Sequence, residues 1–409
     1  MKVAVVGGGV VGLACAWELV RGGAEVELID AGTVGGGVSR GNAGWICPSI
    51  SSPLPAPGIV REGLLQLVRR KGAFVIRPSV DPTLARWLWA FRGLCTVEAF
   101  EAGTRALLEL NRRTMELYDR YRDEGVEFEM HETGLVIAAL SEAELSSHRE
   151  FGQLLRRLGA GDEVEELDGA QAAELEPALD GGHIAGALHA RLDRHVRPES
   201  LIAGFAQSLR AAGVTIHEHR RVESLDALKA DKVVIAAGLG SVGLIRPRMP
   251  FVGAGGYSIT VTGAGTPPAH ALYLAEAKLA VSPFTDGVRI AGVLELGARS
   301  ARAPAGTATR LIASAEPYLG GWRPAPTDEA WAGLRPTTAD GLPLIGAVPD
   351  RPNAYVAAGH AMLGITLAPA TAAALTPLVL HGERSGLLAP FEPSRPARPR
   401  RRRPRGSPA

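Results

Sequence analysis

The N-terminal stretch Lys2–Asp30, KVAVVGGGVVGLACAWELVRGGAEVELID, decides the fold. Its first five residues form an apolar, β-branched run, which is typical of a buried parallel strand. The segment Gly7–Gly12 follows with the spacing G-x-G-x-x-G, and a helical pattern then runs to the next pair of glycines. A second strand ends at Asp30. Strand, glycines, helix, strand and terminal acid in one unit predict a dinucleotide-binding fold.

Each glycine of this spacing has a physical reason. Gly7 permits a tight turn, Gly9 lets a pyrophosphate approach the backbone, and Gly12 lets helix and strand pack closely. The pyrophosphate would bind at the helix N-terminus, beside Val10 and Val11. Asp30 is expected to accept hydrogen bonds from a ribose, which suits NAD and FAD equally. The alternative is a glycine-rich turn that binds nothing, and the complete unit argues against it.

Composition predicts a globular enzyme-sized chain rather than a nucleic-acid or membrane protein. At 409 residues it is long enough for two domains. The net charge is +1, but residues 395–409 hold seven arginines and no acid, so the rest of the chain carries −6. A mildly acidic body argues against nucleic-acid binding. Three scattered cysteines predict no disulfide framework and no metal site, and they fit a reducing cytoplasm. We expect no membrane span, because glycines and Glu18 interrupt the apolar N-terminus.

The middle of the chain reads as a second domain of helices and antiparallel strands. We predict a domain boundary near Pro53–Pro57 and an amphipathic helix over Ile59–Lys71, which is either a membrane-surface helix or an ordinary domain helix with a basic face. A helix starting at Asp81-Pro82 places Trp87 and Trp89 on different faces. Further predicted elements are a long helix over 97–124, a capping box at 141–144, a strand–helix–strand return to the parallel sheet over 184–216, and antiparallel strands at 257–262, 278–281 and 288–291.

The most specific motif lies near the C-terminus. Residues 331–346 read WAGLRPTTADGLPLIG, and they are followed by Gly359-His360 and by the apolar start of a helix near Thr366. Arg335 precedes Pro336, which forces an extended backbone and fixes where the guanidinium points. A planar fork held in one place is suited to a carboxylate. The alternative for Arg335 is a structural salt bridge.

Together with the Asn42-Ala43-Gly44 segment, these motifs resemble the family of FAD-dependent amine and amino-acid oxidoreductases, in particular bacterial D-amino-acid dehydrogenases and glycine oxidases. The resemblance covers roughly residues 1–385. It implies that FAD is the cofactor and that the helix near Thr366 faces the flavin. Trp45 departs from the smaller polar residue expected there, so we expect a pocket of a different shape from the family's. The family's order and spacing are also matched around Tyr257 and at 292–297.

From these observations we predict an α/β fold: a doubly wound Rossmann-type FAD-binding domain with an inserted α+β substrate domain that carries a largely antiparallel sheet. The FAD-binding domain is assigned to 1–53, 192–250 and 335–385, and the substrate domain to 54–191 and 251–334. Residues 386–409, rich in arginine and proline, are expected to be a disordered tail. Pro377 is expected to kink its helix.

The predicted site residues follow from the motifs and the resemblance. The carboxylate clamp is Arg335, with Tyr257, Lys278 and His360 as further catalytic candidates. No metal ligands are predicted. The predicted cofactor-binding residues are Gly7, Gly9, Val10, Val11, Gly12, Asp30, Asn42, Ala43, Gly44, Val222, Ala237, Gly238, Gly359, Gly364, Ile365 and Thr366.

The resemblance implies oxidative deamination of a D-amino acid by hydride transfer from Cα to the flavin, with a quinone or oxygen as electron acceptor. Two alternatives stay open: a glycine, sarcosine or D-hydroxyproline oxidase or dehydrogenase of the same fold, and a non-catalytic FAD-binding redox module. The expected location is the cytoplasm, with peripheral contact to the inner face of a membrane. The sequence indicates neither the preferred side chain nor the oligomeric state.

Overall fold

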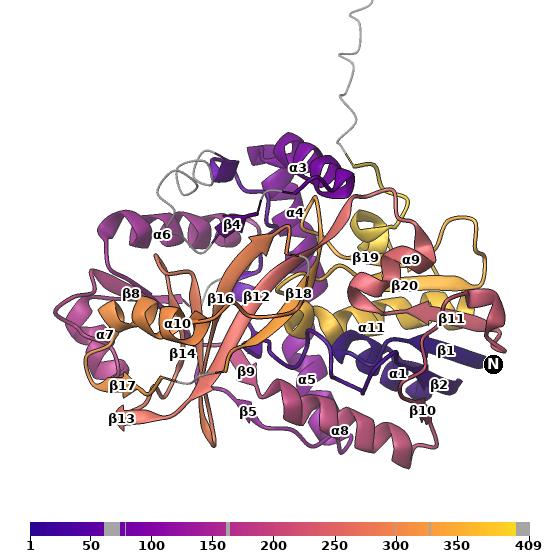
Figure 1. Ribbon diagram of the computed structural model, residues 1–409, viewed down its shortest axis with the longest axis horizontal. Helices are drawn as coiled ribbons and strands as arrows, with labels where there is room; N and C mark the ends of the chain where they lie inside the picture. The colour runs from indigo at the N-terminus through magenta and orange to yellow at the C-terminus, as the bar shows by residue number, and fades with distance from the viewer. Residues whose placement is uncertain (61–73, 78, 161–163, 299, 327–328, 398–409) are drawn as a thin grey trace, which may run out of the picture.

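The first of two large sheets is almost entirely parallel (right side of Figure 1). The computed structural model describes residues 1–60, 74–77, 79–160, 164–298, 300–326 and 329–397. In spatial order the strands are β10 (Thr215–His217), β2 (Glu25–Ile29), β1 (Lys2–Val6), β11 (Lys232–Ile235), β20 (Ala354–Ala358) and β19 (Leu344–Ala347). All neighbouring pairs are parallel except β19 and β20. The strands come from three separated parts of the chain, which confirms the Rossmann-type prediction.

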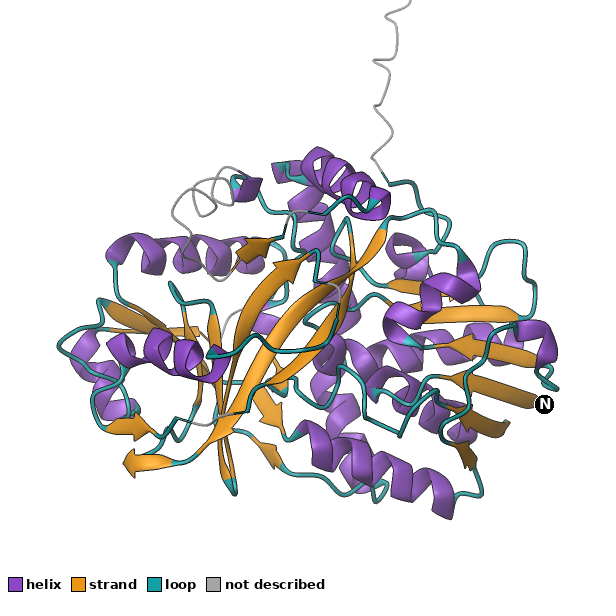
Figure 2. Ribbon diagram, viewed as in Figure 1, coloured by secondary structure: helices purple, strands orange, loops and turns teal. Residues whose placement is uncertain are grey.

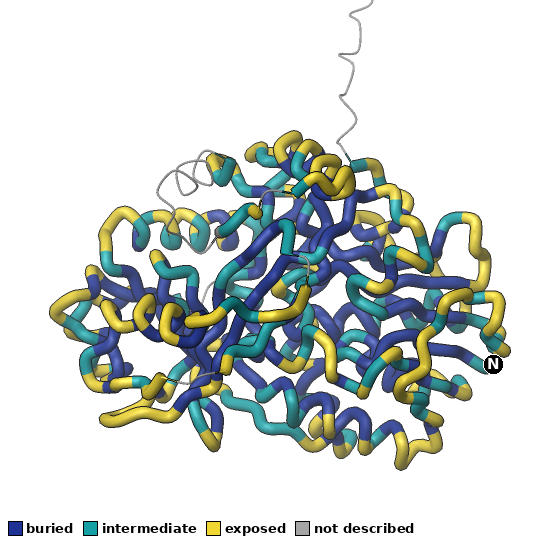
Figure 3. The backbone as a smooth tube through the Cα atoms, in the orientation of Figure 1, coloured by how far each residue is buried: buried dark blue, intermediate teal, exposed yellow. Residues whose placement is uncertain are grey.

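The N-terminal unit lies at the centre of this sheet, as predicted. β1 pairs with β2 on one side and β11 on the other. Its side chains alternate between two buried layers. Val3 and Val5 belong to the core that includes α1 (Val10–Arg21), α8 (Pro198–Ala211) and α11 (Gly364–His381), whereas Ala4 and Val6 belong to the core that includes α3 (Pro82–Leu94). Residues 3–6 of β1 are all buried, and Figure 3 draws buried residues in dark blue, so side chains on both faces of the strand pack into a core.

The second large sheet is mostly antiparallel and lies beside the first (Figure 2). Its described strands follow the order β18 (Trp331–Thr338), β12 (Phe251–Val261), β16 (Gly287–Leu296), β15 (Leu279–Phe284), β14 (Ala271–Leu274), β6 (Leu135–Ala139), β8 (Gly186–Ala190) and β7 (Val164–Leu167), with β4 (Phe74–Ile76) alongside β16. The three antiparallel strands predicted between 257 and 291 are β12, β15 and β16. The two-sheet α/β prediction is confirmed.

Smaller elements complete the structure. Two small sheets are β13 (Gly263–Gly265) with β17 (Trp322–Pro324), and β3 (Trp45–Ile46) with β9 (Arg194–Val196) and β5 (Met130–His131). Among the described residues the remaining helices are α4 (Val97–Asn111), α5 (Thr114–Asp123), α6 (Glu142–Arg157), α7 (Gly169–Leu175), α9 (Ser241–Ile245) and α10 (Thr307–Ala315). The short 3₁₀ turns are η1 (Pro48–Ile50), η2 (Leu225–Ala227), η3 (Gly238–Gly240), η4 (Glu316–Tyr318) and η5 (Gly386–Phe391).

Helix α3 begins where the sequence predicts. The Asp81 carboxylate accepts a hydrogen bond from Thr83 N at 2.8 Å, and Pro82 occupies the first helical position. Trp87 is buried and donates to Thr337 O at 3.1 Å, whereas Trp89 is largely exposed. The two tryptophans thus lie on different faces, as expected.

Two helical predictions are corrected by long-range contacts. The helix expected over 97–124 is broken between α4 and α5, where the Thr114 hydroxyl donates to Thr366 O of α11 at 3.2 Å and docks α5 on that helix. At 141–144 only half of a capping box forms. Ser141 Oγ accepts from Glu144 N, but the Ser141 amide donates to Glu276 Oε1 at 2.9 Å. A residue far away in sequence thereby replaces the local partner.

The strand predicted at 184–190 belongs to a different sheet than expected. β8 pairs antiparallel with β6 and β7 in the large sheet, and β9 joins the small sheet with β3 and β5. The chain enters the parallel sheet one element later, at β10 after α8. The predicted boundary between residues 334 and 335 also falls inside β18, which pairs with β12 along its length.

The C-terminal segment is a further correction. Residues 386–397 are folded against the body rather than disordered: Leu388 and Phe391 are buried in the core, and Arg395 forms an ion pair with Asp340. Burial of these two apolar side chains of η5 stabilises the folded segment, and the prediction of disorder overlooked them because it rested on the high proline and arginine content. Residues 398–409 and most of the helix predicted at 59–71 lie outside the described ranges.

Helix α11 begins at Gly364, two residues before the predicted start. Among the described helices it is the one that is long and apolar enough to cross a membrane, and 56% of it is buried inside the fold. A core helix meets the same criteria, so this is weak evidence for a span. Pro369 and Pro377 both lie within it, and the predicted kink stays a prediction.

Candidate active site

A cavity of about 450 Å³ lies at the carboxyl ends of the parallel strands, where ligands bind in open α/β sheets. The second sheet closes it with β18, from Trp331 to Pro336. The predicted residues that line it are Gly7, Gly9, Val10, Val11, Asp30, Asn42, Val222, Ala237, Gly238, Gly359, Gly364, Ile365, Arg335 and His360. The structure thus brings residues separated by more than 300 positions into one cavity.

The glycine-rich turn has no room for side chains at its two outer glycines. Gly7 has a φ of +112°, and a Cβ there would lie 2.4 Å from Ala236 O of the neighbouring strand. A Cβ on Gly12 would lie 1.9 Å from Gly7 O. Gly12 therefore packs helix against turn, as predicted, and does not itself line the cavity. Gly9 does line it.

The start of α1 offers backbone donors to the cavity. The first intrahelical bond runs from Leu13 N to Gly9 O at 2.9 Å, so the earlier amides have no acceptor within the helix. The amide of Val10 donates a hydrogen bond to Ser39 Oγ at 3.1 Å. Donors at the positive end of a helix suit a pyrophosphate. Ser39 was not predicted, because it lies in a glycine-rich loop without a periodic pattern.

Asp30 is held by backbone amides at the edge of the cavity. Its Oδ2 accepts from Gly8 N at 2.6 Å and its Oδ1 from Gly32 N at 2.7 Å. Each carboxylate oxygen retains acceptor capacity for a ribose hydroxyl. The basic pair Arg220-Arg221, which sequence reasoning missed, lines the same region beside Val222. These features fit the diphosphate and ribose of a dinucleotide.

The loop 40–44 approaches the cavity through Asn42. Asn42 Oδ1 accepts from Gly44 N at 2.8 Å, which folds the loop on itself. Gly44 has a φ of +85°, and a Cβ there would lie 1.9 Å from Val196 O. Gly44 and Ala43 do not line the cavity; Gly44 lets the loop pack on β9. Trp45 points to the second sheet, with Nε1 donating to Ser282 Oγ at 2.9 Å.

The N-terminus of α11 is tied to β18 at the cavity edge. Ala361 N donates to Pro336 O at 3.0 Å, and Gly364 and Ile365 line the cavity. Thr366 lies behind them and donates to Trp45 O at 2.8 Å, so it braces the loop rather than lining the cavity. His360 contacts Thr371 Oγ1 at 3.0 Å, and burial lowers its pKa to about 3. Its ring is therefore neutral near pH 7.

Arg335 is a cation without an acidic partner among the described residues. Its Nη1 donates to Val293 O at 2.7 Å, and none of the described carboxylates forms an ion pair with it. Desolvation by burial lowers the pKa of the guanidinium to about 10. The structural salt bridge considered as the alternative is thus absent from the described part of the chain. Arg335 is partly exposed to the cavity, and an unpaired cation there that is largely shielded from water is costly unless an anion binds it.

The backbone around Arg335 is shaped to receive its guanidinium. A Cβ on Gly256 of β12 would lie 1.9 Å from Arg335 Nη1, so a glycine is required beneath the fork. The pairing of β12 with β16 shifts register between Gly255 and Tyr257, and Val293 in this bulge has a φ of +63°. That conformation costs a β-branched residue on the order of 1–3 kcal/mol. The bulge directs the Val293 carbonyl to Arg335.

Two predicted catalytic residues are not brought into this cavity. Tyr257 is buried and its hydroxyl donates to Glu295 Oε2 at 2.8 Å; burial raises its pKa to about 12. Lys278 lies at the turn before β15 and forms an ion pair with Glu144 of α6. Both contacts depend on strand register and turn geometry, which the sequence pattern does not specify.

Comparison with known proteins gives the family. A family model described as FAD dependent oxidoreductase matches residues 2–378. A D-amino acid dehydrogenase of Rhizorhabdus wittichii is 30% identical over 392 residues, covering 90% of this chain and 93% of that protein. One of Methylobacterium nodulans is 32% identical over 409 residues, covering 93% and 95%.

Solved structures show the same fold. The glycine oxidase of Geobacillus kaustophilus superposes with a TM-score of 0.74 at 24% identity, covering 96% of this chain and 99% of that one. The iminodiacetate oxidase of Chelativorans sp. gives 0.71 at 20% identity, covering 96% and 98%. The family match spans both sheets and every residue placed in the cavity, and the glycine turn, helix terminus and Asp30 fit a dinucleotide. The chain belongs to the FAD-dependent oxidoreductase family, and its cofactor is FAD.

Proposed function

We propose that the protein oxidises a D-amino acid to a 2-oxo acid and ammonia. The observation that carries this proposal is Arg335, a desolvated cation with no acidic partner among the described residues, in the wall of the FAD-binding cavity. An anionic group on the substrate would satisfy it. The curated relatives named D-amino acid dehydrogenase support an amino acid as that substrate and the D form as its configuration.

Arg335 is suited to hold the substrate carboxylate through two parallel hydrogen bonds. A guanidinium carries five N–H donors in a planar fork, and one nitrogen is anchored on Val293 O at 2.7 Å. Gly256 leaves room for the guanidinium, and the left-handed backbone of Val293 directs the carbonyl that holds it. The clamp is therefore organised before substrate binds, which lowers the entropic cost of orienting Cα.

The reaction needs little from side chains beyond this orientation. FAD, when bound, supplies the hydride acceptor, at N5 of its ring. The substrate ammonium group releases one proton to solvent on binding, so the lone pair of the neutral amine can form the C=N bond of an iminium as the hydride leaves Cα. The iminium then takes up water and yields the 2-oxo acid and ammonium. His360 is bonded to Thr371 and is neutral near pH 7 because burial lowers its pKa, so it is not assigned as a general acid in this step.

The N-terminus of α11 contributes electrostatically. It lies at the cavity edge, held to the residue after Arg335 by the bond from Ala361 N to Pro336 O. The positive end of an 18-residue helix favours negative charge nearby. Gly364 and Ile365 thereby add to the attraction that Arg335 exerts on an anionic substrate.

The proposed electron acceptor is a quinone, reached by contact with the inner face of a membrane. The seven arginines of residues 395–409 support an anionic surface as a partner. Arg395 is engaged with Asp340, which leaves the six that follow it in sequence for this role. A glycine- or sarcosine-type oxidase is the second candidate, favoured by the fold shared with glycine oxidase. A non-catalytic FAD module would not need an unpaired Arg335.

Anaerobic reduction of the bound flavin tests the proposal. A panel of D- and L-amino acids, glycine, sarcosine and D-hydroxyproline is mixed with the protein without oxygen, and the visible flavin band is followed. We expect D-amino acids to bleach the band much faster than their L enantiomers. Equal rates, or faster reduction by L forms or by glycine, would contradict it. Hydrogen peroxide formed in air would identify an oxidase instead of a quinone-linked dehydrogenase.

A further inference from the structure

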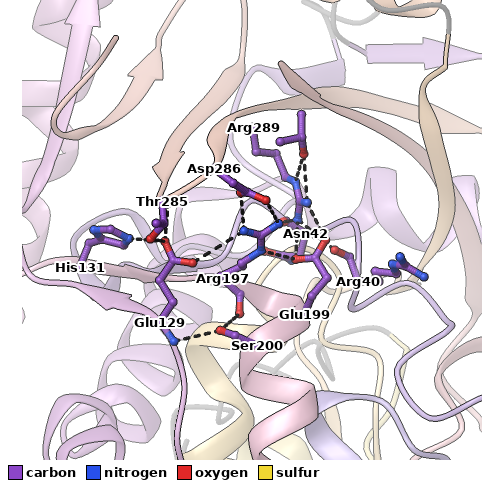
Figure 4. Close-up of polar contacts among 11 residues, drawn as sticks. Arg40, Asn42, Glu129, His131, Arg197, Glu199, Ser200, Thr285, Asp286 and Arg289 are labelled. Carbon is purple, nitrogen blue, oxygen red and sulfur yellow. Dashed lines mark hydrogen bonds and ion pairs between the residues drawn. The ribbon is translucent and has the colours of Figure 1, made fainter. Parts of the chain in front are cut away.

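A second buried arginine, Arg289, joins the substrate sheet to the cofactor loop (Figure 4). It projects from β16 and is 5% exposed. Its Nη1 donates to Arg40 O at 3.0 Å and to Asn42 O at 3.2 Å. Its Nη2 donates to Glu199 Oε1 at 2.6 Å, and both Nε and Nη2 donate to Thr260 Oγ1, at 3.2 and 3.1 Å. Every nitrogen of the guanidinium is thus engaged.

The two loop carbonyls fix the backbone at the cavity. Arg40 O and Asn42 O flank Gly41, and one nitrogen of Arg289 holds both. Gly41 and Asn42 line the FAD-binding cavity. On its other side Gly41 packs against Trp331, because a Cβ there would lie 2.0 Å from the ring. The position of this loop therefore depends on Arg289.

The same strand holds the carboxylate clamp. Val293, four residues after Arg289 in β16, accepts the hydrogen bond from Arg335 Nη1. Four residues of extended strand span about 13 Å. One end of this segment of β16 is bonded to the cofactor loop, and the other is bonded to the residue assigned to the substrate.

We propose that Arg289 is a positioning residue: it fixes the loop 40–44 on β16 and thereby sets the distance between bound FAD and a carboxylate held by Arg335. This inference rests on the proposed function for the role of Arg335. Hydride transfer depends steeply on the separation and alignment of the reacting atoms. Loosening the loop should therefore slow the chemical step more than it weakens substrate binding.

The surrounding network supplies a matched control. Arg197 lies in the same cluster and binds Asp286 with Nη2 2.9 Å from Oδ2. It connects the start of α8 to the turn before β16, so it also joins the two parts of the structure. The hydrogen bonds and ion pairs of its side chain within the described chain go to Asp286, Glu129 and Glu199. Glu199, 3.9 Å from Arg197 Nε, is shared with Arg289, but the Arg197 side chain itself forms no hydrogen bond to the loop 40–44. Comparing the same substitution at Arg197 and at Arg289 therefore shows whether an effect comes from any lost contact between the two parts of the structure or specifically from a displaced loop 40–44.

The experiment compares Arg289→Lys with Arg197→Lys in the FAD-loaded protein. Three quantities are measured: visible circular dichroism of the flavin, hydrogen exchange of residues 39–46, and the limiting rate and substrate dissociation constant of anaerobic flavin reduction. For Arg289→Lys we expect an altered dichroism band, faster exchange and a limiting rate lower by about tenfold or more, with the dissociation constant within about twofold. Arg197→Lys should match the wild type in all three.

If the Arg289→Lys variant loses FAD or aggregates, Thr260→Val takes its place, because it removes the hydroxyl that orients Arg289 and keeps the charge. The same directions are expected. Unchanged dichroism, exchange and limiting rate in Arg289→Lys, or equal changes in Arg197→Lys, would overturn the inference. If no amino acid reduces the wild-type flavin, the proposed function fails, and dichroism and exchange still decide the role of Arg289.

Discussion

Arg289 and Arg335 differ in their hydrogen-bond and ion-pair partners: the first has a carboxylate partner within the protein, and the second has none among the described residues. Arg289 is paired with Glu199, and all its nitrogens find acceptors. Arg335, on a strand of the same sheet, has the Val293 carbonyl and no carboxylate among the described residues. Burying a charge is costly unless it is paired. The satisfied arginine stabilises the fold, whereas we propose that the unsatisfied one is retained, at a cost in stability, because it binds the anionic group of the substrate.

The strand between them, β12, is adapted to each arginine. Thr260 lies opposite Arg289 in register and offers a hydroxyl to it. Beneath Arg335 the same strand has Gly256, which offers space and no acceptor side chain. The difference is therefore encoded by residues on a neighbouring strand, and not by the arginines alone.

The largest expected effect is on stability, and it has opposite sign at the two arginines. Arg289→Met leaves the partly exposed Glu199 without its main partner and the Arg40 and Asn42 carbonyls without their donor, and together these losses should cost about 3–5 kcal/mol. Arg335→Met removes an unpaired charge and should leave stability unchanged or raised. Thermal unfolding of the two holo-proteins measures this. A similar loss in both variants would show that Arg335 also has a structural partner.

The next effect concerns the space under the clamp. Gly256→Ala places a methyl group where Arg335 Nη1 lies and must displace the guanidinium. A displacement of about 1 Å can cost roughly a hundredfold in rate, so we expect kcat/KM to fall by about that factor while FAD stays bound. Gly253→Ala is the control, since its methyl would meet Leu239 instead. Equal activities of the two variants would contradict the assigned position of the clamp.

A third arginine extends the comparison with a smaller effect. Arg395 is paired with Asp340 and donates to Leu342 O at 2.7 Å, so it resembles Arg289. Arg395→Ala should lower the free energy of unfolding by about 1.5–3 kcal/mol, as for bonds to charged groups, with turnover unchanged. Deleting residues 398–409 instead should change neither the free energy of unfolding nor the turnover with a soluble electron acceptor. Denaturant unfolding measures both variants, and an Arg395→Ala protein as stable as the wild type would restore the expectation that this segment does not contribute to folding.

The sequence predicted best those structural features that depend only on residues close together in the chain. The strand, glycines, helix and acid of residues 2–30 are contiguous, so their contacts follow from local pattern. Arg335 was singled out by the resemblance of residues 331–346 to the family and by the restriction that Pro336 places on its backbone; it lies in the cavity wall, and its role as carboxylate clamp stays a prediction. Both predictions needed no knowledge of which strands pair.

What the sequence did not predict depends on partners distant in the chain. Glu276 replaces the local cap of Ser141, and Thr114 breaks a helix by bonding to α11. Lys278 and Tyr257 have suitable chemistry, yet turn geometry and register direct them to Glu144 and Glu295. Arg289 belongs to no recognisable sequence motif. Its proposed role depends on hydrogen bonds to two backbone carbonyls, and a pattern of side chains does not indicate such bonds.

The carboxylate clamp is tested most directly by removing each partner in turn. The second-order rate constant of anaerobic flavin reduction, which is the limiting rate divided by the substrate dissociation constant, is measured for a D-amino acid and for the corresponding amine without its carboxylate, in the wild type and in Arg335→Ala. Losing the cation should cost about 2–5 kcal/mol for the amino acid, roughly thirty- to several-thousand-fold, with FAD retained. Arg335→Lys should also be impaired, because it loses the fork. The amine should be a poor substrate that loses little further on mutation. An Arg335→Ala protein that oxidises D-amino acids with near wild-type efficiency would contradict the clamp.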